Sequence, residues 1–375
     1  MKRFIRIMRE FAGVSLLLLL VVGVSHGASD IPALRDAKDQ AEKDRIQTLM
    51  NGARREGKLT IDAIMVEPKM FKYILEGFKA YYGLSVTDEF TYSSSARIIT
   101  RVEQLLKAGR PTPDIVWNVS WAWYKDLIAR GKMMRYDSPH YKDYTLSHKA
   151  GNSVPAYFVS DSYTFSPMWS PVALAKGGIK DFNPTSWWDF TDPKLGKWTS
   201  MGNISQSQSQ TAMALGLRKT LGEEWFKKMA KLKPALYVKT AQGREWVASG
   251  EYPITIMSHA KNAEEVQKTG VKVKLLYPKE GVVLFPFAPI IMGPAPHPNM
   301  SKLFIDYIRS KPGADRMADA GVCLFAGRPG VKTPLREFLP PTEEIQTIPM
   351  NWDVDDSAEA VKEMQQWVIN IGLSY

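Results

Sequence analysis

Serines that stand directly before helical sequence are the residues whose spacing most suggests chemistry in this chain. Tyr92, Ser93, Ser94 and Ser95 precede an amphipathic segment that ends near Gly109. A helix start offers free backbone N–H groups and a partial positive charge, and serine hydroxyls add donors, so such a start can hold an anion. The same hydroxyls can instead only cap the helix. We interpret the segment as a candidate anion-binding helix start.

A second polar loop has the same character. Residues 201–209 read Met-Gly-Asn-Ile-Ser-Gln-Ser-Gln-Ser and lead into a helical pattern at 208–221. Its candidate ligand contacts are Asn203, Ser205 and Ser207, whose amide and hydroxyl groups can donate and accept hydrogen bonds. A solvated loop is the competing interpretation.

Aromatic, imidazole and cationic side chains complete the candidate ligand contacts. Trp117 and Asn118 follow an apolar strand, and an aromatic face can stack on a ring or hold a cation, although most of the 11 Trp must pack in cores. His259 and Lys261 follow another strand and can form charge-assisted hydrogen bonds to a carboxylate or phosphoryl group, or lie in a solvated loop. The remaining candidates are Trp169 and Arg328.

Strand and helix patterns alternate around these segments, which predicts an α/β fold. After a strand at 59–65, one helix face is formed by Phe71, Ile74, Leu75, Phe78 and Tyr82. A helix from Ser95 to Gly109 should turn inward Ile98, Ile99, Val102, Leu105 and Leu106. Further helices are expected at 29–55, 208–221, 223–231, 243–249, 301–310 and 357–371, and strands at 114–116, 253–257, 271–277 and 282–292.

In their order, these segments resemble the extracellular solute-binding proteins of bacterial ABC importers, in the branch that includes iron-, polyamine- and phosphonate-type binders. The resemblance rests on residues 52–120, 184–193 (Pro-Thr-Ser-Trp-Trp-Asp-Phe-Thr-Asp-Pro), 247–251, 298–310 and 328–331. It implies a two-lobed, type II-like periplasmic-binding-protein fold, in which two crossing strands join lobes built from mixed sheets flanked by helices. It also places 201–209 at the family's ligand loop, without the usual proline, and Trp169 where relatives often carry tyrosine.

The implied organisation is discontinuous. Residues 28–57 form an N-terminal helical extension, 58–157 and 286–375 form lobe one, and 158–285 form lobe two. The first crossing is expected within 157–170 and the return near 278–281, with the helix at 357–371 on lobe one. A ligand that touches both lobes across the cleft would favour the closed state.

Residues 1–27 have the pattern of a cleavable signal peptide. A basic start precedes the apolar run Val14 to Val24, and Ser25-His26-Gly27 supplies small residues at the −3 and −1 positions. The run is short for a membrane span, which is the alternative interpretation. No cysteine lies there, so we expect a periplasmic protein that is not a lipoprotein.

Composition narrows the function classes. The chain of 375 residues has a formal charge of +10, but its basic residues are scattered, so nucleic acid is not an expected partner. Cys323, the single cysteine, lies in an apolar run and is interpreted as a buried structural thiol. We find no P-loop, dinucleotide fingerprint, nucleophile elbow or zinc-protease helix, so neither an enzyme nor a cofactor is expected. An exported enzyme with dispersed catalytic residues remains an alternative.

The expected function is capture of a small organic, anionic solute by a monomer that delivers it to an inner-membrane ABC permease. Ferric-iron binding is an alternative, because ferric-binding relatives use adjacent tyrosines late in the chain. The corresponding stretch 323–328 has no tyrosine, and the pair Tyr81-Tyr82 is interpreted as helix packing. A metal is therefore not expected, and the histidines lack zinc-ligand spacing. A solute sensor is a further alternative.

Overall fold

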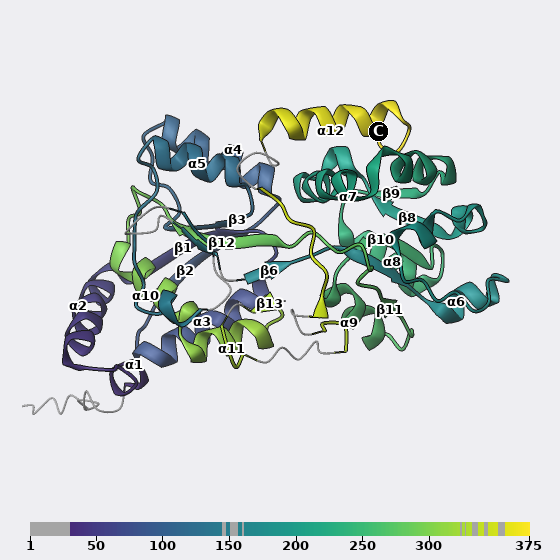
Figure 1. The fold of residues 1–375 in the computed structure, drawn as a ribbon. Helices are drawn as coiled ribbons and strands as arrows, with labels where there is room; N and C mark the ends of the chain where they lie inside the picture. The colour runs from purple at the N-terminus through teal and green to yellow at the C-terminus, as the bar shows by residue number, and fades with distance from the viewer. Residues whose placement is uncertain are drawn as a thin grey trace, which may run out of the picture.

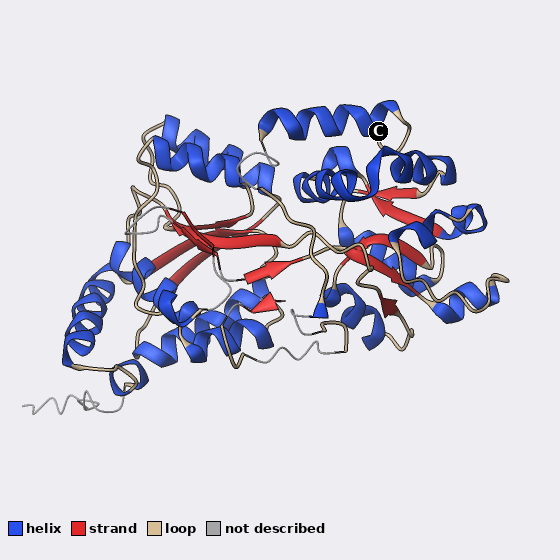
Figure 2. Ribbon diagram, in the orientation of Figure 1, coloured by secondary structure: helices blue, strands red, loops and turns tan. Residues whose placement is uncertain are grey.

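Two mixed β-sheets, each flanked by helices, form the two halves of the molecule (Figures 1 and 2). The computed structural model describes residues 31–144, 148–150, 157–159, 161–322, 325–326, 328–331, 337–340, 344–351 and 357–375. The predicted α/β class is confirmed. The predicted signal peptide and Cys323 lie outside the described residues. No helix in the described part is both long and apolar enough to span a membrane.

The first sheet has the strand order β13-β6-β12-β3-β1-β2. Its strands are β1 (Lys58–Ala63), β2 (Thr87–Tyr92), β3 (Ile115–Asn118), β6 (Asp161–Tyr163), β12 (Phe285–Ile291) and β13 (Phe325–Ala326). Strand β1 pairs in parallel with both β2 and β3, and β12 is antiparallel to β3. The carboxyl ends of β1, β2 and β3 therefore meet at one edge. A separate pair joins β4 (His148–Ala150) to β5 (Tyr157–Val159).

Helices flank this sheet in the first half, some in contact with its strands and others packed on those helices. They are α1 (Pro32–Arg35), α2 (Gln40–Glu56), α3 (Pro68–Tyr82), α4 (Ser95–Lys107), α5 (Trp121–Ala129), η2 (Tyr141–Asp143), α10 (Pro298–Arg309) and α11 (Lys311–Asp319). All five apolar positions predicted for α3 are buried. In α4, Ile98 and Val102 are buried, whereas Ile99, Leu105 and Leu106 are only partly covered. The helix predicted at 29–55 is two helices, because Asp39 caps α2 by accepting from the backbone N–H of Glu42.

The second sheet has the order β11-β7-β10-β8-β9. Its strands are β7 (Ser166–Trp169), β8 (Thr199–Gly202), β9 (Ala235–Tyr237), β10 (Ile254–Ser258) and β11 (Lys274–Leu275). Strand β8 is parallel to β9 and β10, so these three strands also share a carboxyl edge. The helices of this half are α6 (Pro171–Lys176), η3 (Trp187–Thr191), η4 (Pro193–Trp198), η5 (Ile204–Gln206), α7 (Gln208–Leu232), α8 (Thr240–Ser249) and α9 (Ala260–Lys268).

Helix α7 contains a break where the sequence predicts two helices. Gly222 has φ 71° and ψ 179°, a conformation that essentially only glycine adopts. The predicted segments 208–221 and 223–231 are therefore the two arms of one kinked element.

Three segments cross between the halves within the described chain. The first passes from β6 to β7 at Thr164, and its hydroxyl donates to the carbonyl of Val283 in the second, at 2.6 Å. The third runs beside the second, because Thr347 pairs with Val282 and the N–H of Ile348 donates to the Val282 carbonyl at 2.8 Å. These bonds join all three crossings in one place.

The third crossing corrects the predicted place of the C-terminal helix. Helix α12 (Ala358–Asn370) packs on α7 of the second half, not on lobe one (Figure 1). Its Trp367 ring lies 5.4 Å from Phe226 and beneath the guanidinium of Arg218. The amphipathic pattern of α12 indicated a buried face but not the surface that covers it. Residues 286–375 therefore do not form a single half, and two crossings are too few.

Candidate functional site

Three helix starts differ from the other serine-capped helices of the described chain. Ser94, Ser120 and Ser207 are the N-caps of α4, α5 and α7, and none of these hydroxyls accepts a hydrogen bond from its own helix. The serine caps that do so in the described part are Ser170, Ser186, Ser310 and Ser357. Since the first N–H groups of a helix have no partner within it, these three starts keep donors available.

These helix starts meet between the halves. The Ser95 hydroxyl donates to Asn118 Oδ1 at 2.7 Å, and Gln208 Nε2 donates to the Ser120 hydroxyl at 3.2 Å. Ser95 Oγ also lies 3.5 Å from Gln208 Oε1. Ser95, Asn118 and Ser120 belong to the first half and Gln208 to the second, so we call these four residues the interlobe cluster.

The topology explains why these residues converge. Helix α4 follows β2, α5 follows β3 and α7 follows β8, so each begins at the carboxyl end of a parallel strand. In open α/β sheets this edge is where ligands bind. Ser95 and Asn118 lie at this edge, and their contact with a ligand stays a prediction.

Asn118 has an unsatisfied amide in this cluster. Its side chain is fully buried, and Oδ1 accepts from both Ser95 and the backbone N–H of Val119. Its Nδ2 has no hydrogen-bond partner in the described chain. An unpaired buried amide costs about 1–3 kcal/mol, so a ligand acceptor at this position would recover that cost.

The second predicted ligand loop is occupied by the last residues of the chain. Ser374 Oγ bonds to Asn203 Oδ1 and accepts from the backbone N–H of Ser205 at 3.1 Å. The Ser205 hydroxyl donates to the Tyr375 carbonyl at 2.9 Å, and Ser207 Oγ lies 3.3 Å from Ser209 Oγ. The solvated-loop alternative is wrong for Asn203, because its side chain is fully buried. Sequence could not indicate a partner 169 residues away.

His259 is not the cation that its sequence context suggests. The imidazole is 8% exposed, and Nδ1 accepts from the backbone N–H of Asn262 to cap α9. Burial lowers the pKa of His259 to about 4, with the charges of Arg244 and Lys261 acting in the same direction. The ring is therefore neutral at pH 7, and only Nε2–H can donate. Lys261 is already paired with Glu264 at 2.6 Å.

The other predicted contacts lie in packed surroundings. Trp117 is fully buried in the first sheet, and the Trp169 ring packs edge-on against Phe190 at 6.0 Å. Arg328 donates to Asp143 at 2.9 Å, so its charge is compensated. Tyr92 ends β2 with half its surface exposed, and Ser93 follows it. Their contact with a ligand stays a prediction.

Sequence reasoning placed Ser120 beside Trp117 and Asn118 after the strand at 114–116 but did not list it as a ligand contact, and it missed Gln208 as a contact and Arg244 as a candidate cation. Ser120 and Gln208 stand in the recognised segments, and their roles as an N-cap and a first-turn residue are signals that could have found them. Arg244 lies on α8, which follows β9, and this strand of three residues is too short to show a period.

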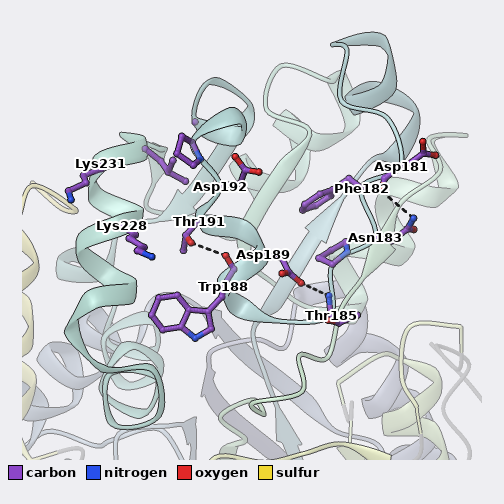
Figure 3. Close-up of a pocket in the computed structure, with 14 residues that line it drawn as sticks. Asp181, Phe182, Asn183, Thr185, Trp188, Asp189, Thr191, Asp192, Lys228 and Lys231 are labelled. Atoms are coloured by element: carbon purple, nitrogen blue, oxygen red, sulfur yellow. Dashed lines mark hydrogen bonds between the residues drawn. The ribbon is translucent and has the colours of Figure 1, made fainter.

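A groove of about 930 Å³ on the second half lies apart from the cluster (Figure 3). Its walls include Asp189, Asp192 and Trp188, with Lys228 5.4 Å from the Trp188 ring. Asp189 accepts from the backbone N–H of Thr185 at 2.7 Å, and Asp192 accepts from that of Lys194 at 2.9 Å. These carboxylates are therefore engaged in holding the local backbone.

Metal ligation finds no support among the described residues, where no group of three His, Cys, Asp or Glu could hold an ion. Tyr81 and Tyr82 pack edge-on at 5.1 Å on α3, and burial raises the pKa of both phenols. Their interpretation as packing residues is confirmed.

A family model supplies the decisive comparison for these two halves and their shared site. The model described as "Bacterial extracellular solute-binding protein" matches residues 110–351. The chain is a bacterial extracellular solute-binding protein. The predicted family is confirmed, and the family is non-enzymatic, as expected. As a member of this family, the chain is an extracellular protein that binds a solute. A search of curated sequences finds no significant match.

Solved structures share the fold of this solute-binding protein at low identity. The periplasmic binding protein AfuA from Actinobacillus pleuropneumoniae, with exogenous fructose-6-phosphate bound, has a TM-score of 0.71 at 18% identity, covering 84% of this chain and 99% of that one. An ABC-transporter substrate-binding protein from Agrobacterium tumefaciens has 0.69 at 13%, covering 91% and 97%. Iron-bound HitA from Pseudomonas aeruginosa has 0.66 at 15%, covering 84% and 99%.

Proposed function

We propose that this protein captures a small organic anion between its halves and delivers it to an inner-membrane ABC permease. The observation that carries the proposal is the convergence of three serine-capped helix starts whose hydroxyls leave their own helices uncapped. Each start contributes N–H donors and partial positive charge, an effect of about 0.3–1 kcal/mol per charge at exposed sites and more when buried. An anionic head can be held there without a buried cation.

Binding across the interlobe cluster would couple the ligand to closure. Ser95 and Ser120 come from the first half and Gln208 from the second, so a ligand on both faces interacts more strongly with the closed state. The joined crossings at Thr164, Val282 and Thr347 are the natural hinge, since only they connect the two halves in the described chain. The closed, loaded form is the state proposed to dock on the permease.

Sugar phosphates are the first probes, because one structural neighbour has fructose-6-phosphate bound. Thermal-shift and calorimetric titrations of the protein should cover fructose-6-phosphate, glycerol 3-phosphate, aliphatic carboxylates, polyamines, neutral sugars and ferric citrate. A ligand that binds only the folded state raises the midpoint in proportion to the logarithm of its concentration. We expect binding within the anionic organic compounds.

The variant Ser95→Ala, combined with Ser94→Ala, should weaken this binding by about tenfold or more with little loss of stability. Ser170→Ala is the matched control, because Ser170 caps α6 and does not belong to the cluster. The control should lose about 1 kcal/mol of stability and keep its affinity. Binding of ferric iron alone, or anion affinity that survives the serine double variant, would overturn the proposal.

A further inference from the structure

Glu67 and Arg244 are partly buried charged side chains that remain unpaired in the described chain. Neither side chain makes a hydrogen bond or an ion pair there, and both lie outside the interlobe cluster. By contrast, Arg45 and Arg328, which are also partly buried, pair with Asp306 and Asp143. Partly burying an uncompensated charge costs free energy, so a partner for each is expected.

Glu67 stands at the ligand edge of the first sheet. It is the N-cap residue of α3, four residues after the end of β1, and its side chain makes no capping bond. In the β1–β2 pairing, Ala63 at the end of β1 lies opposite Tyr92 at the end of β2. Glu67 therefore follows the same edge that presents Tyr92 and, three residues later, Ser95.

The backbone between the end of β1 and Glu67 has an unusual conformation. Met65 has φ 59°, a left-handed conformation that is uncommon for residues other than glycine. Residues held in this way cluster at binding sites, where the surroundings over-determine them. The loop that carries Glu67 is thus held in a specific shape at the edge of the sheet.

Arg244 stands at the matching edge of the second sheet. It lies on α8, which begins at Thr240 after β9 and packs against β10 and α9. The backbone N–H of Asn203 donates to the Tyr237 carbonyl at 2.7 Å, which joins the end of β9 to the loop that leads into α7. Helices α7 and α8 therefore begin side by side.

Both charges act on Tyr92, at the end of β2. Burial raises the pKa of Tyr92, the Glu67 carboxylate raises it further, and the Arg244 guanidinium lowers it. Arg244 also lowers the pKa of His259, which lies on the second half. The Arg244 charge therefore acts on a residue of each half, and neither Arg244 nor Glu67 forms an ion pair within the described chain.

This arrangement is unfavourable for a ligand that carries only negative charge. A carboxylate beside an anion site repels the anion, by about 1 kcal/mol at 4 Å even in water. An ammonium group on the same ligand would instead be attracted to the Glu67 carboxylate and would offset this repulsion. The Arg244 guanidinium suits the acidic end of such a ligand, because its fork of N–H donors matches a carboxylate or phosphoryl group.

We propose that Glu67 and Arg244 are specificity-determining residues and that the solute is a zwitterion, with its acidic group at Arg244 and the α4 start and its ammonium at Glu67. This inference rests on the proposed function of the same site. It narrows the acidic solute to one that also carries an ammonium group, such as a small amino acid, an aminophosphonate or an amino phosphate ester.

The test compares ligands that differ only in the ammonium group. Calorimetric titrations would pair 2-aminoethyl phosphate with ethyl phosphate, and ω-amino carboxylates of two to five carbons with the plain carboxylates. We expect the amino member of the best pair to bind about tenfold tighter or more. Glu67→Gln should reduce that ratio toward one, whereas Arg244→Gln should weaken both members by about tenfold.

Matched controls are Glu76→Gln on α3 and Glu245→Gln on α8, both exposed and on the same helices. They should leave both affinities unchanged. A plain anion that binds as tightly as its amino partner, or a preference that survives Glu67→Gln, would overturn the inference. If that anion still requires Ser95, the proposed function stands and only the zwitterion is wrong. If no member of any pair binds, both proposals fail.

Discussion

His259 shows how burial changes the chemistry of a residue that the sequence presents as a cation. The side chain follows β10 at the ligand edge, where a charged imidazole would attract an acidic group. Its Nδ1 instead caps α9, and burial is the largest cause of its lowered pKa, about 4. A neutral donor remains available among the predicted residues, because the Asn118 Nδ2 group has no hydrogen-bond partner in the described chain.

The lowered pKa of His259 should make the protein less stable in mild acid. The unfolded chain binds a proton below about pH 6.5 that the folded chain refuses down to about pH 4, so stability falls as pH drops through this window. Between about pH 7.5 and 5 the loss from this residue should be about 2 kcal/mol. Urea unfolding at the two pH values would measure it.

His259→Asn is the variant that isolates this effect. Asparagine is a good N-cap, so the bond to the Asn262 N–H has a replacement while the titrating group is removed. The variant should lose less stability than the parent chain on acidification. An identical pH dependence in both proteins would mean that His259 titrates as an exposed residue.

Residue types at helix starts could predict part of the site, because a serine before an apolar period has few roles. Ser95 was predicted from its place before a helix and Asn118 from its place after a strand, and the structure brings them into contact. Arg244 could not be predicted as a site residue, since a single arginine on a short helix belongs to no motif or periodic pattern. Its significance comes from the missing partner, which only the folded chain shows.

Helix α12 shows what an amphipathic pattern leaves undetermined. The apolar spacing predicts the helix and the side that is buried, as it does for α3. It cannot distinguish two halves that both offer apolar surface. Contact with α7 decides the position of α12 and brings Ser374 and Tyr375 onto the loop before α7.

Removing the Ser374 hydroxyl should destabilise this attachment. It contacts Asn203 and accepts from the Ser205 N–H, both largely withdrawn from water. Ser374→Ala should cost about 1–3 kcal/mol, because those groups lose a buried partner. Ser249→Ala is the control, since its exposed hydroxyl bonds only near its own helix end. Equal unfolding midpoints for the two variants would contradict the role of Ser374.

At the scale of the whole molecule, the three crossings form one bonded bundle. Thr164, Val282 and Val283 are buried there, and the hydroxyl of Thr164 donates to the Val283 carbonyl. The sequence predicted the α/β class and the first two crossings from strand order along the chain. It did not predict the third, because residues 344–351 have no strong period of their own.

Thr164→Val tests how much the hydrogen bond between the first two crossings contributes to stability. Valine has nearly the same shape but leaves the buried Val283 carbonyl without its donor, so the free energy of unfolding should fall by about 1–3 kcal/mol. Thr269→Val is the control, since its hydroxyl makes a similar local bond at the end of α9. Chemical unfolding measures both variants. A loss no larger than that of the control would show that the first two crossings are not coupled by this bond.

An odd number of crossings has a consequence for the two ends of the described chain. A chain that crosses an even number of times returns to the half where it began, whereas three crossings leave it on the other. Ile31 precedes α1 on the first half, and Tyr375 lies on the second, far across the molecule (Figure 1). A donor fluorophore at one end and an acceptor at the other would therefore report closure directly, as a change in energy transfer, with no label inside either half.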